Sequence, residues 1–359
     1  MKCTIQFTLF LLAAHGTFAA MLRGSTPAQC ALSKCASQAS ACLADTQCKT
    51  KVTCALACTT ESCIDSCAGA SPDAATSALV SCAVAQGCVT SSTHATNVTS
   101  VGVLDDTFST ARALEFLHFS NAAYCDASTI DDWSCKPCQK ADSTFKGKSF
   151  TDEKTEGQAF VGANDGNIVV AFRGSSNLDN WIADLSFKQV SAYPKCNGCE
   201  VHGGFYADWV ALMPGIVNET LRLHKEQPNA QLFVTGHSLG AALAVLAASE
   251  LHYTQGLTIT AVYTYGEPRV GNKAFKDFYN QGTHLSWRIT HNKDPVPKLP
   301  PTAFGFTHIQ REVYYNEDST SYKVCDGSGE DKTCSDSTIS TDVNDHLSYL
   351  GITTGGAAC

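Results

Sequence analysis

Apolar runs of strand length alternate with helical stretches through most of the chain after residue 104. Runs rich in β-branched and aromatic residues predict buried strands at residues 168–172, 231–234, 258–265 and 286–290. An Ala- and Leu-rich run from Leu239 to Leu251 predicts a helix soon after the second of these strands. Such alternation is typical of an α/β fold with a central, mostly parallel sheet.

The first ninety residues follow a different pattern, in which cysteines are separated by Ala, Ser and Thr with few aromatic residues. The ten cysteines of this part are Cys30, Cys35, Cys42, Cys48, Cys54, Cys58, Cys63, Cys67, Cys82 and Cys88. Disulfides must replace a hydrophobic core here, and two C-x3-C spacings favour short helices. A zinc cluster is the alternative, but no histidine lies among these cysteines, so we expect no metal.

The N-terminus has the pattern of a secretory signal peptide. A basic start at Lys2 precedes an apolar run, residues 4–14, that is too short to span a bilayer, and small residues follow up to Ala20. A buried N-terminal helix is the alternative interpretation. Of 19 cysteines, 18 remain once Cys3 leaves with the signal, an even number that suits disulfides in a secreted protein. Asn97 and Asn218 begin N-glycosylation acceptor patterns.

These patterns predict four parts: a signal peptide at 1–19, a cysteine-rich disulfide domain at 20–90, a polar linker at 91–103 and an α/β domain at 104–359. Hydrophobic residues make up 44% of the 359 residues and charged residues 16%, which excludes a mostly disordered chain. The formal net charge of −9 offers no basic surface for nucleic acid or for an anionic membrane.

The segment Gly236-His237-Ser238-Leu239-Gly240 fits the G-x-S-x-G pattern of a nucleophile elbow. A predicted strand precedes it and a predicted helix follows it, which is the context that the elbow requires. The glycines allow the sharp turn, and Ser238 then lies near a helix N-terminus, where developing negative charge is favoured. An ordinary strand-to-helix turn flanked by glycines is the alternative.

The elbow predicts an acid and then a histidine further along the chain. Asp294 follows the predicted strand at 286–290, and only His308 and His346 come after it. His346 lies in a polar loop before a final apolar stretch and is the better candidate for the base, although a lone histidine is often a surface or packed residue.

Six ordered motifs resemble the fungal class 3 lipases and their relatives, the type A feruloyl esterases. They are Val170 to Ser175, Val201 to Phe205, Gly236 to Gly240, Tyr265 to Arg269, Asp294 to Pro297 and Asp345-His346. The resemblance implies an α/β-hydrolase fold and assigns the acid to Asp294 and the base to His346, with no cofactor. It places the oxyanion hole at the backbone N–H groups of Ser175 and Leu239, although Ser175 could instead cap the next helix. It implies the disulfides Cys125–Cys359, Cys135–Cys138, Cys196–Cys199 and Cys325–Cys334.

The segment after Ser175 resembles the lid of these lipases. Leu178, Trp181, Ile182 and Leu185 share one face of a predicted helix. The resemblance implies a triacylglycerol lipase acting at a lipid–water interface, unless this helix is permanently packed on the core.

Residues 196–204 look closer to the feruloyl esterases, so an esterase of cell-wall esters is the alternative, and a catalytically idle binding protein is a remoter one. Residues 29–67 faintly resemble the cysteine-rich region of violaxanthin de-epoxidase. The N-terminal domain is expected to bind a wall polymer, a partner protein or nothing.

Overall fold

The computed structural model describes residues 107–282 and 284–359. The chain divides into two compact units, Met1–Thr99 and Ser100–Cys359, and every described residue belongs to the second. The expected signal peptide, cysteine-rich domain and linker, together with Asn97, lie outside the described residues.

An eight-stranded sheet forms the centre of the described unit, in the order β1-β2-β3-β6-β7-β9-β11-β12. The five strands from β3 to β11 run parallel, and the strands at both edges pair antiparallel. The strands are β1 (Lys146–Asp152), β2 (Gly157–Ala163), β3 (Asn167–Phe172), β6 (Gln231–His237), β7 (Ala261–Tyr265), β9 (Leu285–His291), β11 (Glu312–Tyr315) and β12 (Tyr322–Val324). The predicted α/β-hydrolase fold with a mostly parallel sheet is confirmed.

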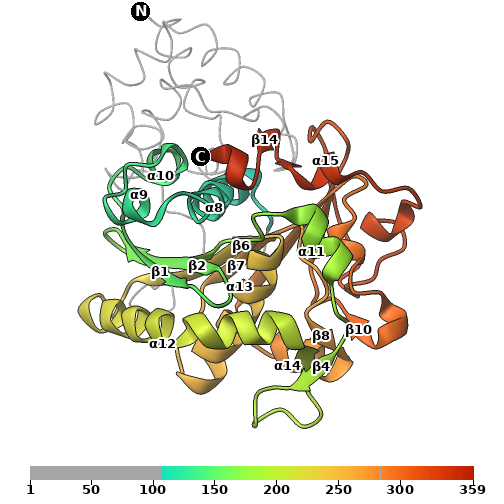
Figure 1. The fold of residues 1–359 in the computed structure, drawn as a ribbon, viewed down its shortest axis with the longest axis horizontal. Coiled ribbons are helices and arrows are strands. Elements are labelled where there is room, and N and C mark those ends of the chain that lie inside the picture. The colour runs from blue at the N-terminus through green and yellow to red at the C-terminus, as the bar shows by residue number, and fades with distance from the viewer. Residues whose placement is uncertain (1–106, 283) are drawn as a thin grey trace, which may run out of the picture. The chain divides into compact units, whose positions relative to one another are not determined.

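Helices cover both faces of this sheet, as Figure 1 shows for α8 on one side and α12 and α14 on the other. Alternate residues of one strand therefore enter different cores: Ile168 and Val170 pack with α12 and α13, whereas Val169 and Ala171 pack with α8. The helices are α8 (Thr110–Ala122), α9 (Ala127–Asp131), α10 (Lys136–Ala141), α11 (Leu178–Asp184), α12 (Gly203–Glu226), α13 (Leu239–Ser249), α14 (Lys273–Asn280) and α15 (Val343–His346).

Several predicted boundaries differ from the structure, and the strand expected at 231–234 continues to His237. The strand expected from residue 258 begins at Ala261, although Ile259 before it is buried, because an apolar pattern reports burial as well as strand geometry. The helix expected to reach Leu251 is α-helical only to Ser249 and continues as a π-helical turn, Glu250–Thr254. The main-chain N–H of Gln255 then donates to the carbonyl of Glu250, the i to i+5 spacing of that turn.

Two small sheets and four disulfides complete the unit. The small sheets are β10-β8-β5-β4, from β4 (Gln189–Ser191), β5 (Glu200–His202), β8 (Gly271–Asn272) and β10 (Phe306–Thr307), and β13-β14, from β13 (Ser348–Tyr349) and β14 (Ile352–Thr353). The disulfides join Cys125 to Cys359, Cys135 to Cys138, Cys196 to Cys199 and Cys325 to Cys334. These are the four pairs that the family resemblance implied.

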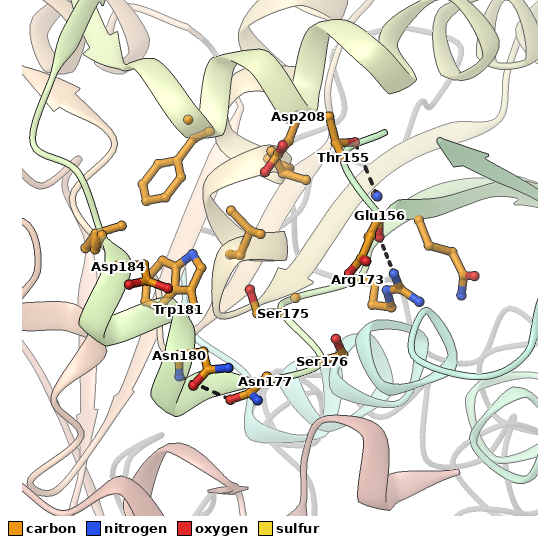
Figure 2. A pocket seen from close by; sticks show the side chains of 18 of the residues that line it. Thr155, Glu156, Arg173, Ser175, Ser176, Asn177, Asn180, Trp181, Asp184 and Asp208 are labelled. Carbon is orange, nitrogen blue, oxygen red and sulfur yellow. Dashed lines mark hydrogen bonds between the residues drawn. The ribbon is translucent and has the colours of Figure 1, made fainter. Parts of the chain in front are cut away.

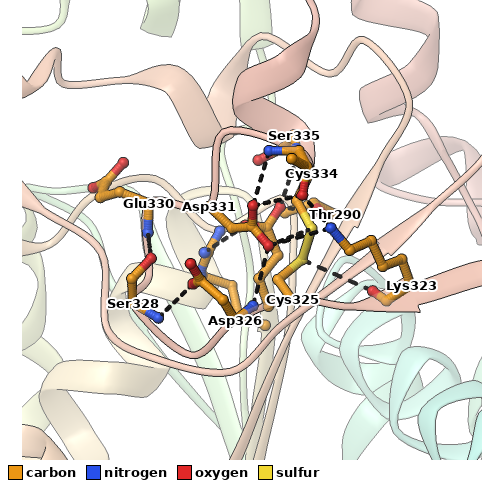
Figure 3. The surroundings of a disulfide bond; sticks show 12 residues. Thr290, Lys323, Cys325, Asp326, Ser328, Glu330, Asp331, Cys334 and Ser335 are labelled. Carbon is orange, nitrogen blue, oxygen red and sulfur yellow. Dashed lines mark hydrogen bonds and ion pairs between the residues drawn. A yellow bond between two sulfur atoms is a disulfide. The ribbon is translucent and has the colours of Figure 1, made fainter.

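The Cys325–Cys334 disulfide closes a loop that turns around Asp331 (Figure 3). The Asp331 carboxylate accepts hydrogen bonds from the main-chain N–H groups of Asp326, 3.1 Å, and Thr333, 2.9 Å. Within this loop Glu330 reaches the buried guanidinium of Arg269, with 2.7 Å between Oε2 and Nη2. No helix in the described ranges is long and apolar enough to cross a membrane.

Candidate active site

The turn between β6 and α13 presents Ser238 in a backbone conformation that side chains rarely adopt, with φ 61° and ψ −130°. A Cβ atom at Gly236 would collide with the main chain of Gly240, and one at Gly240 would collide with Phe172. The two glycines therefore permit the close approach of strand and helix that forces this turn. Ser238 is only 2% exposed, and its Oγ has no hydrogen-bond partner in the described part of the chain.

Asp294 and His346 meet although they are 52 residues apart in the sequence. Asp294 lies in the turn after β9 and His346 ends the short helix α15. His346 Nδ1 lies 2.8 Å from Asp294 Oδ2, and because an ionised carboxylate can only accept, Nδ1 carries the hydrogen. In the neutral imidazole Nε2 is then the unprotonated nitrogen, and it has no partner among the described residues.

Other donors fix the Asp294 carboxylate. The main-chain N–H of Val296 donates to Oδ1, 2.8 Å, and the Tyr349 hydroxyl donates to Oδ2, 2.5 Å. Burial is the main cause that raises the pKa of Tyr349 well above its ordinary value, so this hydroxyl remains protonated. The carboxylate is thus oriented by three donors, one of which is His346.

Hydrogen bonds also hold the main chain around Asp294 and His346. Asp345 accepts hydrogen bonds from the Asn292 side chain and the Lys293 N–H, both 3.0 Å, which ties α15 to the turn that carries Asp294. Gly266 has φ +57°, and a Cβ there would lie 2.7 Å from Cε1 of His346. A glycine at this position therefore leaves room for the imidazole.

His308, the other histidine after Asp294, lies in a different environment. Its Nε2 faces the carbonyl of Pro297 at 2.6 Å, and its Nδ1 is 3.9 Å from Oε1 of Glu267. Burial and the nearby Arg288 and Arg269 lower the pKa of His308 well below its ordinary value. The structure therefore pairs Asp294 with His346 and not with His308.

A pocket of about 480 Å³ opens beside the nucleophile turn (Figure 2). Ser175 and Leu239 line it, and Trp181 of α11 closes one side, where its ring stacks on Phe205 with centroids 6.1 Å apart and planes 15° apart. The remaining lining residues are Thr155, Glu156, Gly157, Gln158, Arg173, Gly174, Ser176, Asn177, Asn180, Asp184, Leu185, Ser186, His202, Gly204, Asp208 and Leu243.

The expected lid residues occupy α11 or its end. Leu178, Trp181 and Ile182 lie within the helix, whereas Leu185 is its C-cap, and all four are partly buried. Asn177 caps the helix by accepting from the N–H of Asn180, 3.1 Å. The capping role considered for Ser175 is therefore filled by Asn177.

Charged side chains line the pocket on several sides. Glu156 and Arg173 lie together on one side, Asp184 lies beside Trp181 on the other, and Asp208 belongs to α12 (Figure 2). Burial, assisted by the charge of Asp152, raises the pKa of Asp208 to about 6. Burial also lowers the pKa of His202, which faces the carbonyl of Ser186.

Three side chains of this site were not predicted from the sequence. Tyr349 follows His346 by three residues, and this closeness in the sequence was a signal that the two side chains could belong to one site. His237 lies inside the recognised motif, where its ring contacts that of His346 in a tilted arrangement with centroids 4.4 Å apart. Tyr124, 2.8 Å from Nδ1 of His237, is 113 residues away in the sequence, and no local signal points to it.

Glu312, Cys325 and Cys334 stand close enough together to suggest a metal site within the described ranges. The two sulfur atoms are bonded to each other, so they are not the thiolates that metals bind. This cluster is therefore explained by the disulfide.

The family model for class 3 lipases matches residues 169–304. A lipase of Rhizomucor miehei is 39% identical over 231 residues, which cover 62% of this chain and 63% of that protein. The secreted mono- and diacylglycerol lipase 1 of Fusarium solani is 36% identical over 251 residues, which cover 66% of this chain and 74% of the relative. The chain belongs to the class 3 lipase family. Its members are carboxylic ester hydrolases.

Solved structures of the class 3 lipase family match the described unit. The lipase of Rhizopus microsporus var. chinensis superposes with a TM-score of 0.66 at 32% identity, and the match covers 69% of this chain and 88% of the Rhizopus chain. A triacylglycerol lipase described as having a serine protease triad at its catalytic centre has a TM-score of 0.64 at 36% identity, over 68% of this chain and 96% of that one.

A second family model, that of the VDE lipocalin domain, matches residues 27–188. It overlaps the class 3 lipase match from residue 169 onwards. Within its described part, β1, β2 and β3 belong to the eight-stranded sheet, where β3 pairs in parallel with β6. The described end of this match thus has the architecture of the lipase family.

Proposed function

We propose that this chain is a secreted triacylglycerol lipase in which Ser238, His346 and Asp294 form the catalytic triad. One observation carries the proposal. Asp294 accepts the Nδ1–H of His346, which leaves Nε2 as the basic nitrogen, and both this Nε2 and the Oγ of Ser238 are buried atoms without partners among the described residues. Buried polar atoms are nearly always hydrogen bonded. Two buried atoms without partners in a candidate triad therefore favour the interpretation that both act on a substrate.

In this mechanism Nε2 of His346 accepts the Ser238 hydroxyl proton as Oγ attacks the ester carbonyl. Asp294 keeps the imidazole in the required tautomer and stabilises its cationic form. His346 then gives the proton to the departing alcohol, and an acyl group remains on Ser238. Water deprotonated by His346 attacks this acyl group, the acid leaves, and Ser238 regains its proton.

The negative oxygen of each tetrahedral intermediate is stabilised by the N–H groups of Ser175 and Leu239. Leu239 is the first residue of α13, where main-chain N–H groups have no partner within the helix. Both residues line the pocket beside the nucleophile turn. A donor of this kind is worth roughly 3 kcal/mol in comparable enzymes. The residues of the triad and the oxyanion hole require no metal or organic cofactor.

Helix α11 is proposed as the lid that governs contact with a lipid–water interface. Its apolar side chains Leu178, Trp181 and Ile182 are only partly buried, so they have apolar surface left to bury. Burying such a side chain fully in lipid is worth about 1.5–3 kcal/mol. The relatives named as lipases support a lipid ester as the substrate.

Export is part of the proposal. A signal peptide at 1–19, the cysteine-rich domain at 20–90 and the linker at 91–103 would precede the lipase unit, and secreted relatives support this reading. Asn218 is exposed on α12, where a glycan would meet solvent. For the cysteine-rich domain we propose a role separable from catalysis, with a wall polymer or a protein as candidate partner.

Two substrates separate a lipase from the alternative feruloyl esterase. We expect turnover of emulsified triolein to rise steeply above the solubility limit of the substrate, with little release of ferulate from methyl ferulate. Trp181→Ser should weaken the first activity more than hydrolysis of a soluble butyrate ester. Ala183→Ser, on an exposed position of the same helix, is the matched control. Robust ferulate release without triolein hydrolysis would assign the chain to the esterases.

A further inference from the structure

His237, the residue before the nucleophile, contacts the candidate base through both its ring face and its ring edge. Its imidazole packs against that of His346 in a tilted arrangement, with centroids 4.4 Å apart and an interplanar angle of 32°. Its Nε2 lies 2.9 Å from the main-chain carbonyl oxygen of His346. The same carbonyl accepts from the Thr354 hydroxyl at 3.1 Å. His237 is 1% exposed, so water does not compete for these contacts.

The partners of His237 define its hydrogen positions. A carbonyl oxygen can only accept, so Nε2 carries a hydrogen and donates it to His346. Nδ1 lies 2.8 Å from the hydroxyl of Tyr124, which donates to it when the imidazole is neutral. Both nitrogens of the uncharged ring are therefore satisfied.

The surroundings keep His237 in that uncharged form. Burial, followed by the nearby charge of His346, lowers the pKa of His237 well below its ordinary value. The other groups that face the ring are the phenols of Tyr124 and Tyr349 and the hydroxyl of Thr354, none of which supplies a negative charge. Within the described residues, a protonated His237 would have no counter-ion in direct contact.

We propose that His237 is a positioning residue for His346, which it holds by the main-chain carbonyl and the ring face while remaining an uncharged neighbour. This inference rests on the proposed role of His346 as general base. His346 becomes a cation during each proton transfer, and a second cation 4.4 Å away would oppose that step. A neutral imidazole supports the ring without that repulsion.

The role predicts a dependence on the leaving group. A displaced His346 cannot deliver its proton accurately to a departing alkoxide, whereas p-nitrophenolate leaves without one. In His237→Leu we expect kcat/KM for ethyl butyrate to fall about 10- to 100-fold, the effect of misplacing a catalytic group by about 1 Å, and kcat/KM for p-nitrophenyl butyrate to fall several-fold less. His237→Gln, which keeps an N–H for the carbonyl of His346, should recover much of the loss.

The full chain should be used, with the active fraction counted by a serine-directed phosphonate and folding checked by circular dichroism. His308→Gln, at a buried histidine outside the site, is the control for loss of a buried imidazole. Equal losses on the two esters per active molecule, or no recovery in His237→Gln, would overturn the positioning role. Failure of the triad itself would appear separately, as substantial turnover by Ser238→Ala.

Discussion

Two buried polar clusters lie around strands β6, β7, β9 and β11, and they differ in the charges that they contain. The triad cluster, made by Ser238, His237, Asp294, His346 and Tyr349, contains one carboxylate surrounded by neutral donors. The charge cluster contains two arginines and several carboxyl groups. Its members are Glu267, Arg269, Arg288, His308, Glu312 and Glu330.

The charge cluster pairs its ions with one another. Arg288 and Glu312 are 0% and 2% exposed and lie 3.0 Å apart, as neighbours in the register of β9 and β11. Glu330, which lies in the Cys325–Cys334 loop, forms an ion pair with Arg269 and so connects that loop to the segment that follows β7.

Among the described residues, buried atoms without partners occur in both clusters: Ser238 Oγ and His346 Nε2 in the triad cluster, and Glu267 Oε1, Arg288 Nε and Nη1, and His308 Nδ1 in the charge cluster. The four residues other than Ser238 each keep a hydrogen bond through another side-chain atom. Ser238 differs because its only polar side-chain atom has no partner, which leaves its hydroxyl available for chemistry.

Ser238→Ala should produce the largest effect. The hydroxyl makes no hydrogen bond in the described structure, so its loss removes chemistry without removing a contact. We expect esterase activity to fall by about 10⁴-fold or more, with an unchanged melting temperature. Initial rates on tributyrin and a thermal melt measure the two quantities. A phosphonate that still labels the alanine variant would show that another residue is the nucleophile.

Arg288→Met tests the opposite behaviour in the charge cluster. It leaves Glu312 buried without its ion-pair partner, which should lower the free energy of unfolding by about 3–5 kcal/mol. Urea unfolding measures this loss, while kcat per active molecule should stay near the wild-type value. The double variant Arg288→Met/Glu312→Leu should be more stable than Arg288→Met alone. A drop in kcat without a loss of stability would show that Arg288 supports catalysis, which would contradict the structural role given to the charge cluster.

Glu267→Gln addresses the pH dependence of stability. Burial raises the pKa of Glu267 from its ordinary value of 4.5 to about 7, so between these values the native state binds a proton that the unfolded state releases. The free energy of unfolding therefore falls as pH rises through this window, by at most about 3 kcal/mol from this group. Glutamine cannot ionise and should remove that fall.

The measurement is urea unfolding from pH 4.5 to pH 7.5 for both proteins. His308 contributes with the opposite sign, because its lowered pKa makes the native state resist protonation as pH falls. The difference between wild type and Glu267→Gln removes that common contribution. Parallel curves for the two proteins would mean that Glu267 has an ordinary pKa.

Tyr349→Phe should give the smallest effect. It removes one of the three donors to Asp294 and leaves the ring in place. A hydrogen bond to a charged group is worth at least about 1.5 kcal/mol, so we expect kcat/KM to fall about tenfold. An unchanged kcat/KM would remove Tyr349 from the positioning of Asp294.

The sheet and the triad candidates could be predicted from local patterns. Ser238 is marked by a strand, a glycine-flanked turn and a helix that are contiguous in the sequence, and Asp294 follows a strand in the expected chain order. The pairing of Asp294 with His346 then needed only a choice between two histidines.

The supporting contacts could not be predicted in the same way. Arg288 meets Glu312 only because β9 and β11 pair in one particular register, which no periodicity specifies. Tyr124 reaches His237 across 113 residues of chain. The polar loop expected around His346 folds instead into the short helix α15, and His346 is 1% exposed, because the turn at Asn292 and Lys293 hydrogen bonds to Asp345 in that helix.

The disulfide between Cys125 and Cys359 turns most of the lipase unit into a covalent ring, since it joins residues 234 positions apart. A protease that cuts once inside the ring yields two pieces that remain attached to each other until a reductant is added. His346 lies inside this ring, so the segment that carries it stays covalently attached to the rest of the unit after a single cut. Under the proposed export, one cut by an extracellular protease would leave the two pieces of the unit linked, whereas the same cut would separate an open chain into two fragments.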